Sequence, residues 1–394
     1  MKNLVFIITA FIIIAVAACS DMEMKPVNKS SGKPEKVEIL STDSIVPGGV
    51  VINYRIPQDN DILSVKAVFT ITNGQQRVES ASFYTSYLAL YGFNDEDEHE
   101  ALIYTVNRSG DLSDPVTVKF RPGESPLNKA VRSMQILPDW GGVAFFWLNP
   151  DKSMLTFEFF GEDAFGEMAT MRIISSKNDN SVGQTFRGYD STPIRFAVII
   201  RDNYGNSSEM IYPVGNYILP FPEYKLDKTK MKMVRLAGDS NWENWGGSDA
   251  YLIDDDTDTY AHTDILPAGG VFTVDFGVPV QLSRMLMWQR AATYYNGQPK
   301  KWELYTTDHT GDTPSGDWSA WELGSLCEVY KPSDSPLGTN TPDDLTAARL
   351  GLEASISRDM KVSRYIRVRI TENFNPANYM WCPTEFTFYG FEVQ

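Results

Sequence analysis

The segment from Met287 to Tyr305, MWQRAATYYNGQPKKWELY, concentrates side chains that could bind a polar ligand. Within one short loop it carries a planar cation, two phenol rings and a carboxamide: Arg290, Tyr294, Tyr295 and Asn296. A guanidinium offers a rigid fork of donors, and a carboxamide offers both a donor and an acceptor. The pattern therefore predicts a loop that binds a flat, hydroxylated molecule. The alternative is that Arg290 forms a structural salt bridge at the end of a sheet.

Tryptophan is concentrated in the same part of the chain. Seven of the nine tryptophans lie between residues 231 and 394: Trp242, Trp245, Trp288, Trp302, Trp318, Trp321 and Trp381. Such a concentration favours exposed aromatic platforms in addition to a core. Trp245 in particular could stack, like the two tyrosines, on the apolar face of a sugar ring.

An acidic run is the second group of residues with possible chemistry. It consists of Asp254, Asp255, Asp256 and Asp258. An EF-hand is excluded, because Thr259 and Ile265 occupy the loop positions that require glycine and glutamate. The run is then a solvated acidic turn or a cation site of another kind. A second acidic stretch, NDEDEHE at 94–100, is expected to be a solvated hairpin loop.

Catalysis finds little support in the sequence. The motifs GxSxG, HExxH and the phosphate-binding P-loop are absent from it. Carboxylates are plentiful, but no predicted unit is large enough for the barrels that usually carry glycosidase pairs. The chain is therefore expected not to be an enzyme. Its net charge of −16 also argues against nonspecific binding of nucleic acid, which needs a basic surface.

The N-terminus predicts export and lipid anchoring. The apolar run from Leu4 to Ala18 is too short to span a membrane and is typical of a signal peptide, assigned to residues 1–18. It leads into Val16-Ala17-Ala18-Cys19, which resembles a bacterial lipobox. Cys19 is then the lipidated residue, residues 19–35 are a tether, and the membrane is contacted through lipid alone. The alternative is an ordinary signal peptide with a chance cysteine.

The remaining sequence predicts three β domains. Short strand-like segments with turn signals such as Asn73-Gly74 favour an immunoglobulin- or fibronectin-like sandwich over residues 36–122. A second sandwich is expected at 123–222, because IYTVNRSGDLSDPV (103–116) and AVIIRDNYGNSSEMI (197–211) share a local pattern 95 positions apart. Residues 231–394 predict an antiparallel jelly roll. The whole chain is thus expected to be all-β.

Alternation within one strand of this third domain predicts which side chains face the core. In RYIRVRI (364–370), Ile366, Val368 and Ile370 are expected to point inward. Tyr365, Arg367 and Arg369 are expected on the solvent side, as part of a balanced surface. Two cysteines beyond Cys19, Cys327 and Cys382, could form a disulfide or remain as buried thiols.

The third domain resembles the discoidin or coagulation-factor type C fold, a galactose-binding-like jelly roll. The resemblance rests on YLIDDDTDT (251–259), His262-Thr263, TVDFG (273–277), the Arg290 and Asn296-Gly297 loop, WELY (302–305), RYIRVRI and TEFTFYG (384–390). It implies that Arg290, Asn296 and His262 contact sugar hydroxyls, although for His262 the role of a satisfied, partly buried histidine is preferred. It also implies a structural Ca²⁺ held by Asp254, Thr259 and Glu385. Here Asp255 replaces the usual glycine.

The whole chain is similar to Bacteroidetes lipoproteins of glycan-utilisation systems, in which two sandwiches precede such a module. PGGVVINYRIP (47–57), SVKAVFT (64–70) and GGVAFFWLNP (141–150) carry this likeness, and the acidic stretch after Cys19 resembles their surface-export signal. The resemblance implies a lipoprotein on the outer face of the outer membrane. It would capture polysaccharide or oligosaccharide for a partner outer-membrane importer. The alternative is a structural or adhesive lipoprotein that docks on a transporter or a host protein.

Overall fold

The structure is a computed structural model that describes residues 32–177, 183–292, 294 and 297–393. The predicted signal peptide and Cys19, together with Tyr295 and Asn296, lie outside these residues. Contacts between residues divide the chain into two compact units. Of the described residues, the first unit contains those up to 135 and those within 146–183 and 197–212, and the second contains those within 136–145, 184–196 and 213–393. Among the described residues, no helix has the length and apolar character needed to cross a membrane.

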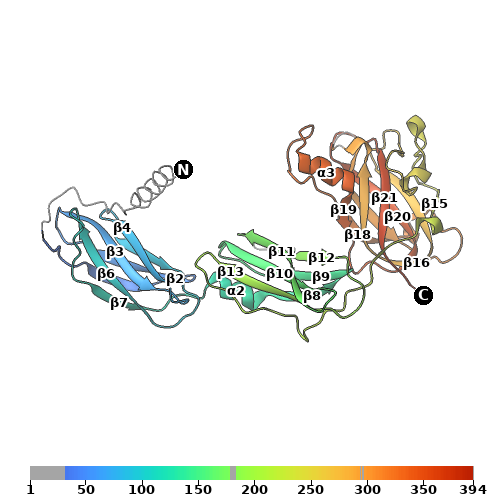
Figure 1. Ribbon diagram of the computed structural model, residues 1–394. Helices are drawn as coiled ribbons and strands as arrows, with labels where there is room; N and C mark the ends of the chain where they lie inside the picture. Colours follow the sequence, from blue (N-terminus) through green and yellow to red (C-terminus); the bar gives the residue numbers. More distant parts are fainter. Residues whose placement is uncertain (1–31, 178–182, 293, 295–296, 394) are drawn as a thin grey trace, which may run out of the picture. The chain divides into compact units, whose positions relative to one another are not determined.

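The first unit begins with a sandwich of two antiparallel sheets (Figure 1). One sheet has the order β1-β2-β5 and consists of β1 (Glu38–Val46), β2 (Gly49–Arg55) and β5 (Tyr87–Tyr91). The other has the order β4-β3-β6-β7 and consists of β3 (Ile62–Thr70), β4 (Gln76–Ser82), β6 (His99–Asn107) and β7 (Val116–Phe120). Alternate residues of β2 and β3, such as Ile52 and Ala67, are buried in one core. The two sheets therefore pack face to face, as in immunoglobulin-like domains.

The rest of the first unit adds one helix and one sheet. Helix α2 (Pro126–Ser133) starts with proline and is capped by Ser125, whose Oγ accepts a hydrogen bond from Asn128 N at 2.9 Å. Strands β10 (Leu155–Glu162), β11 (Met168–Ser176) and β13 (Phe196–Asp202) form a sheet of order β11-β10-β13. The buried ring of Trp147 stacks on Phe157 with 4.2 Å between the ring centroids.

The local repeat in the sequence corresponds to a repeated turn in the structure. Asn107 Oδ1 accepts hydrogen bonds from the backbone N–H groups two and four residues later, and Asp202 Oδ1 does the same 95 positions on. Ser113 Oγ and Ser208 Oγ each accept from a backbone N–H of the preceding strand, at 3.1 and 2.9 Å. The shared residues are therefore those that close the same strand–turn–strand connection.

The second unit contains one small sheet and the jelly roll. The small sheet, of order β12-β9-β8, consists of β8 (Gln135–Asp139), β9 (Gly142–Phe146) and β12 (Gln184–Arg187). The jelly roll contains β14 (Tyr224–Lys225), β15 (Lys232–Val234), β16 (Gly270–Gln289), β17 (Pro299–Thr306), β18 (Glu322–Glu328), β19 (Leu352–Ser355), β20 (Ser363–Asn373) and β21 (Pro383–Glu392). Its helices are α3 (Pro342–Leu350) and the short 3₁₀ turns η1 (Lys228–Lys230), η2 (Asn244–Gly246), η3 (Asp249–Leu252), η4 (Arg290–Ala292) and η5 (Trp318–Ala320).

Strand β16 connects the layers of the jelly roll. The main path of the sheet is β14-β21-β16-β20-β17-β18, and β15 and β19 also pair with β16. Residues 270–275 of β16 pair with β15 and β20, Val280 pairs with both β20 and β21, and residues 281–289 pair with β19 and β21. The change of partner spans Gly277, whose φ of 77° suits glycine. The predicted all-β class, with sandwiches followed by a jelly roll, is confirmed.

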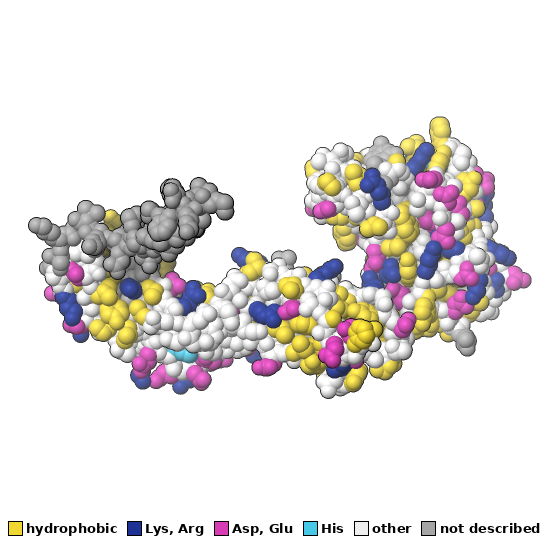
Figure 2. All heavy atoms as spheres, viewed as in Figure 1, with side chains coloured by type: hydrophobic (Ala, Val, Ile, Leu, Met, Phe, Trp, Pro, Cys, Tyr) yellow, Lys and Arg dark blue, Asp and Glu magenta, His cyan; other side chains and the backbone are white. Residues whose placement is uncertain are grey.

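The prediction that Tyr365 and Arg367 face solvent is wrong. Both side chains of β20 are fully buried, at 0% exposure. Arg367 donates to Asp239 Oδ1 and to the carbonyl oxygens of Gly316 and Ala237, and its guanidinium lies 4.1 Å from the ring centroid of Trp318. Segments far away in the sequence thus cover the second face of the strand. Elsewhere Lys and Arg are interspersed with Asp and Glu on the surface of the jelly roll (Figure 2).

Both cysteines of the jelly roll are buried thiols. Cys327 and Cys382 are buried, and burial raises the pKa of Cys327 to about 12 and that of Cys382 to about 11. Of the two alternatives left open by the sequence, the structure therefore has buried thiols. Both remain protonated at neutral pH, which makes them unreactive.

Candidate ligand-binding site

Arg290 lies at the end of β16, where the strand passes into η4. Its guanidinium carbon is 3.8 Å from the centroid of the Tyr260 ring, and its backbone N–H donates to Oε1 of the buried Gln298 at 3.0 Å. Tyr260 in turn donates its hydroxyl to Trp245 O at 2.6 Å. The cation–π contact and these hydrogen bonds connect three loops and orient the guanidinium.

Trp245 is the exposed tryptophan near Arg290 and Tyr260. Of the seven tryptophans in the jelly roll, all of them among the described residues, Trp245 alone is largely exposed, at 75%. It adopts a left-handed backbone conformation with φ 54° and ψ 31°, which is uncommon for a large side chain. Large apolar side chains are normally placed where they pack. An exposed tryptophan on a constrained turn is therefore a candidate contact for a ligand.

The turn that carries Trp245 is held by a short bridge to the segment around His262. His262 N donates to Trp242 O at 3.0 Å, and Asn244 N donates to His262 O at 3.1 Å. A Cβ atom on Gly247 would lie 2.7 Å from His262 N, so only glycine allows this close approach. The two segments therefore keep Trp245 and His262 together, with 6.3 Å between their ring centroids.

His262 combines a structural role with one available nitrogen. The residue is buried, at 9% exposure, and its Nδ1 is 2.7 Å from Thr263 O. Because a carbonyl oxygen only accepts, Nδ1 must carry the proton in the neutral ring. The acceptor nitrogen is then Nε2. The Nδ1 side of the His262 ring thus has the structural role. Contact of Nε2 with a ligand stays a prediction.

Tyr294 does not serve as a stacking platform in this structure. Its side chain is 1% exposed and packs edge-to-face on Phe374, with 4.9 Å between centroids. Burial raises the pKa of its hydroxyl to about 12. Tyr295 and Asn296 lie outside the described residues, so their predicted roles stay predictions. The second ring beside Arg290 is instead that of Tyr260, which sequence reasoning missed. Its position two residues before His262 was the available signal, because alternate residues of an extended segment share a side.

Of the three predicted calcium ligands, Glu385 pairs with a lysine, whereas Asp254 and Thr259 hydrogen-bond to each other. Glu385 is 2% exposed, and its Oε1 accepts from Lys228 Nζ at 2.5 Å while its Oε2 accepts from Asp255 N at 2.8 Å. Lys228 Nζ is also 2.9 Å from Asp255 Oδ1. Asp254 Oδ2 accepts from the Thr259 hydroxyl at 3.0 Å. Burial raises the pKa of Glu385 to about 7, although the adjacent ammonium favours the ionised carboxylate.

These contacts do not fit an oxygen cage for Ca²⁺. A calcium site needs six to eight oxygen ligands around one point. Here a buried ammonium contacts the Glu385 carboxylate, so a divalent cation beside it would be repelled. Asp255, which replaces the usual glycine, has the φ of 63° that a glycine favours and uses its carboxylate to hold Lys228. The chain thus supplies its own cation at this position.

We expect the stability of the protein to be independent of calcium. Addition of EDTA or of millimolar CaCl₂ should leave its melting temperature unchanged in differential scanning calorimetry. Lys228→Met should lower the free energy of unfolding by about 2 kcal/mol, because it leaves the buried Glu385 without its partner. Lys225→Met is the matched control, since Lys225 Nζ is 2.8 Å from the same Asp255 carboxylate but is half exposed. It should change stability by less than about 0.5 kcal/mol. A fall in melting temperature with EDTA would contradict this interpretation.

Three family models match consecutive parts of the chain, and each describes a domain of unknown function. They are DUF4959 over residues 34–122, DUF5126 over 123–229 and DUF5000 over 252–390. No curated protein has a matching sequence.

Several solved structures are similar to the chain. One is the SusE-like protein BT2857, with 30% identity; the match covers 67% of this chain and 98% of that chain, with a TM-score of 0.42. Another is the family 32 CBM from C. perfringens NanJ in complex with galactose, with 13% identity, 42% and 98% coverage and a TM-score of 0.30. A third is a segment of two fibronectin type III domains from chicken tenascin, with 11% identity, 46% and 97% coverage and a TM-score of 0.23.

Proposed function

Because the chain belongs to the family of SusE-like proteins, we propose that it is a glycan-binding protein of the bacterial cell surface that performs no catalysis itself. The observation that carries the proposal is the exposure of Trp245 beside the Arg290–Tyr260 pair. Such a combination of an apolar ring and fixed donors matches a sugar, which has an apolar face and a rim of hydroxyl groups.

The proposed binding mode assigns one role to each side chain. Trp245 stacks on the apolar face of a pyranose, and Arg290 donates hydrogen bonds to one or two ring hydroxyls. His262 accepts a hydrogen bond at Nε2 from another hydroxyl, because its Nδ1 is already committed to Thr263 O. One stacked ring and a few hydrogen bonds give weak binding. Many copies on one surface recover avidity for a polymer.

The finer part of the proposal concerns location and partners. Cys19 carries a lipid that anchors the chain to the outer membrane, with the domains facing the exterior. The captured polysaccharide or oligosaccharide passes to a partner outer-membrane importer. Cys19→Ala should release the protein from the membrane fraction, and protease added to intact cells should digest the wild-type chain. Protection from protease would contradict the outward orientation.

A binding assay with matched variants tests the sugar site. After a glycan array identifies a ligand, its affinity is measured by affinity-gel retardation or calorimetry. Trp245→Ala should weaken binding at least about tenfold, because removal of a central aromatic contact costs about 2 kcal/mol or more. Arg290→Lys keeps the charge but loses the planar fork, and should weaken binding several-fold. Tyr330→Ala is the control, since Tyr330 is an exposed ring (68%) of the same domain that follows β18.

Two outcomes would overturn the assignment. One is that no glycan binds the wild type, and the other is that Trp245→Ala binds a glycan as tightly as Tyr330→Ala does. Prolonged incubation with the bound glycan should also give no shorter product by chromatography. Release of such a product would show catalysis.

A further inference from the structure

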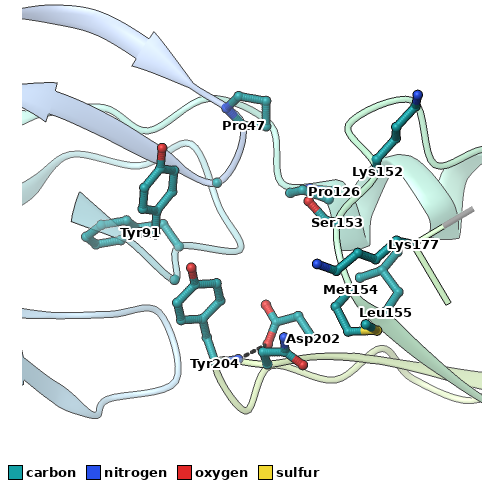
Figure 3. A pocket seen from close by; sticks show the side chains of 14 residues that line it. Pro47, Tyr91, Pro126, Lys152, Ser153, Met154, Leu155, Lys177, Asp202 and Tyr204 are labelled. Carbon is teal, nitrogen blue, oxygen red and sulfur yellow. Dashed lines mark hydrogen bonds between the residues drawn. The ribbon is translucent and has the colours of Figure 1, made fainter. Parts of the chain in front are cut away.

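A hollow of about 280 Å³ lies in the first compact unit, away from the jelly roll in the sequence (Figure 3). Tyr91, at the end of β5, and Tyr204, in the turn after β13, form one side of it. Lys177, which follows β11, and Met154, which precedes β10, form the other side. The hollow is large enough for one sugar ring.

The wall that carries Tyr204 is rigidly built. Asn206 Nδ2 donates to Gly92 O at 3.0 Å, and Asn73 Nδ2 donates to Tyr204 O at 2.9 Å. A Cβ atom on Gly92, whose φ is 109°, would lie 3.1 Å from the Tyr204 ring, so glycine permits the close packing of this ring. The Arg77 guanidinium stands 5.2 Å from the centroid of the same ring. Because these contacts come from several strands and turns, the hollow is a preformed feature of the fold.

The side chains of the hollow combine aromatic rings with an available positive charge. In Figure 3 the Lys177 amine extends toward the hollow, and the Tyr91 and Tyr204 rings stand on the facing side. Within the part of the chain that the structure describes, Lys177 has no ion-pair partner within 4.0 Å. Many other lysines have such a partner. Lys129 Nζ, for example, is 2.8 Å from Asp151 Oδ2. Lys152, at the rim, likewise has no ion-pair partner among the described residues.

Asp202 is the one acidic side chain among the described residues that line the hollow, and it does not cancel this positive charge. Asp202 Oδ1 accepts two backbone N–H groups, and its Oδ2 accepts from Asn206 Nδ2 at 2.8 Å. These donors already stabilise the carboxylate as part of the turn. Two lysines against one engaged carboxylate leave a local positive charge in a chain whose net charge is −16. Such a local excess attracts an anionic group.

We propose that this hollow is a second saccharide site, which selects a sugar ring bearing a carboxylate, as in a uronic acid. The Tyr91 and Tyr204 rings contact the sugar ring, and the Lys177 ammonium pairs with its carboxylate. Lys152 adds long-range attraction at the rim. The site is separate from the Trp245 site and does not depend on its function. It would let the chain hold an acidic polymer at a second point.

The test uses the full mature chain with the Trp245→Ala substitution, so that the jelly-roll site is impaired. Trigalacturonate and the neutral trisaccharide of galactose are titrated by calorimetry at 50 and 300 mM NaCl. Trigalacturonate should bind at least about fivefold more tightly than the neutral sugar, and the higher salt should weaken it. Lys177→Gln should reduce its affinity at least about fivefold. Lys66→Gln is the control, because Lys66 is a lysine of β3 that does not line the hollow.

Each of three results would overturn the proposal. The first is equal binding of the acidic and neutral sugars, and the second is wild-type affinity for trigalacturonate in Lys177→Gln. The third is an equal loss in Lys66→Gln, which would indicate only the overall charge of the chain. Because the assay is made in the Trp245→Ala background, failure here leaves the jelly-roll assignment standing. Conversely, binding of trigalacturonate in the Trp245→Ala background would not count as support for the proposed site at Trp245.

Discussion

Replacement of Arg367 by methionine is expected to lower the free energy of unfolding of the jelly roll by about 3 to 5 kcal/mol. Arg367 is fully buried, and its guanidinium is 2.7 Å from the carboxylate of Asp239, which is 2% exposed. Methionine fills a similar volume but leaves that carboxylate buried without a counter-charge. It also leaves the carbonyl oxygens of Gly316 and Ala237 without their donor. Removal of one partner of a buried ion pair is among the most destabilising single changes.

Urea unfolding followed by tryptophan fluorescence measures this effect, because most tryptophans belong to the jelly roll. Arg369→Met is the matched control on the same strand. Arg369 donates to Glu303 Oε2 at 2.6 Å, but its side chain is 36% exposed, so its loss should change stability by less than about 1 kcal/mol. Adding Asp239→Asn to Arg367→Met should recover part of the loss, since it removes the uncompensated charge. Equal effects of the two arginine substitutions would contradict the prediction.

Trp242→Ala and Trp245→Ala are expected to differ strongly in their effects on stability, although the two residues lie only three positions apart. Trp242 is 1% exposed, donates its indole N–H to Val271 O at 2.9 Å and packs edge-to-face on Phe272. Its removal leaves a large cavity and should lower the free energy of unfolding by about 3 to 5 kcal/mol. Trp245 is 75% exposed, so its removal should change stability by less than about 0.5 kcal/mol.

The same urea experiment distinguishes these variants, and glycan affinity gives the second measurement. Trp245→Ala should keep the wild-type unfolding midpoint while it loses glycan binding. Trp242→Ala should lose both, because it removes the support of the turn that carries Trp245. A loss of 2 kcal/mol or more in Trp245→Ala would show that this residue has a structural role, and the proposed site would then lose its platform.

The β architecture could be predicted because it depends on local features of the sequence. Alternating apolar residues in strands such as Ser64 to Thr70, together with the turn at Asn73-Gly74, specify strands and hairpins without any distant contact. The repeat with Ser113 and Ser208 could be read for the same reason, since each turn is closed by hydrogen bonds within a few residues or to the adjoining strand.

The candidate site could be predicted only in part. The sequence indicated Arg290, His262 and Trp245, and the structure places the His262 ring near Trp245 and connects Trp245 to Arg290 through Tyr260. The sequence did not indicate that the Tyr294 ring turns inward against Phe374. Two adjacent tyrosines have the same local pattern whether they point to the core or to solvent. The neighbours that decide this come from other strands.

The sequence by itself thus determined the all-β class, the repeated turn and the concentration of possible ligand contacts near the end of β16. Tertiary structure alone decided which of these side chains are accessible. Arg367 is buried because distant loops cover its strand, and the buried Glu385 carboxylate has a counter-charge because the chain folds Lys228 against it. The physical reason is the same in both cases. Burial and charge pairing depend on residues far apart in the chain, whereas strand and turn formation depends on neighbours.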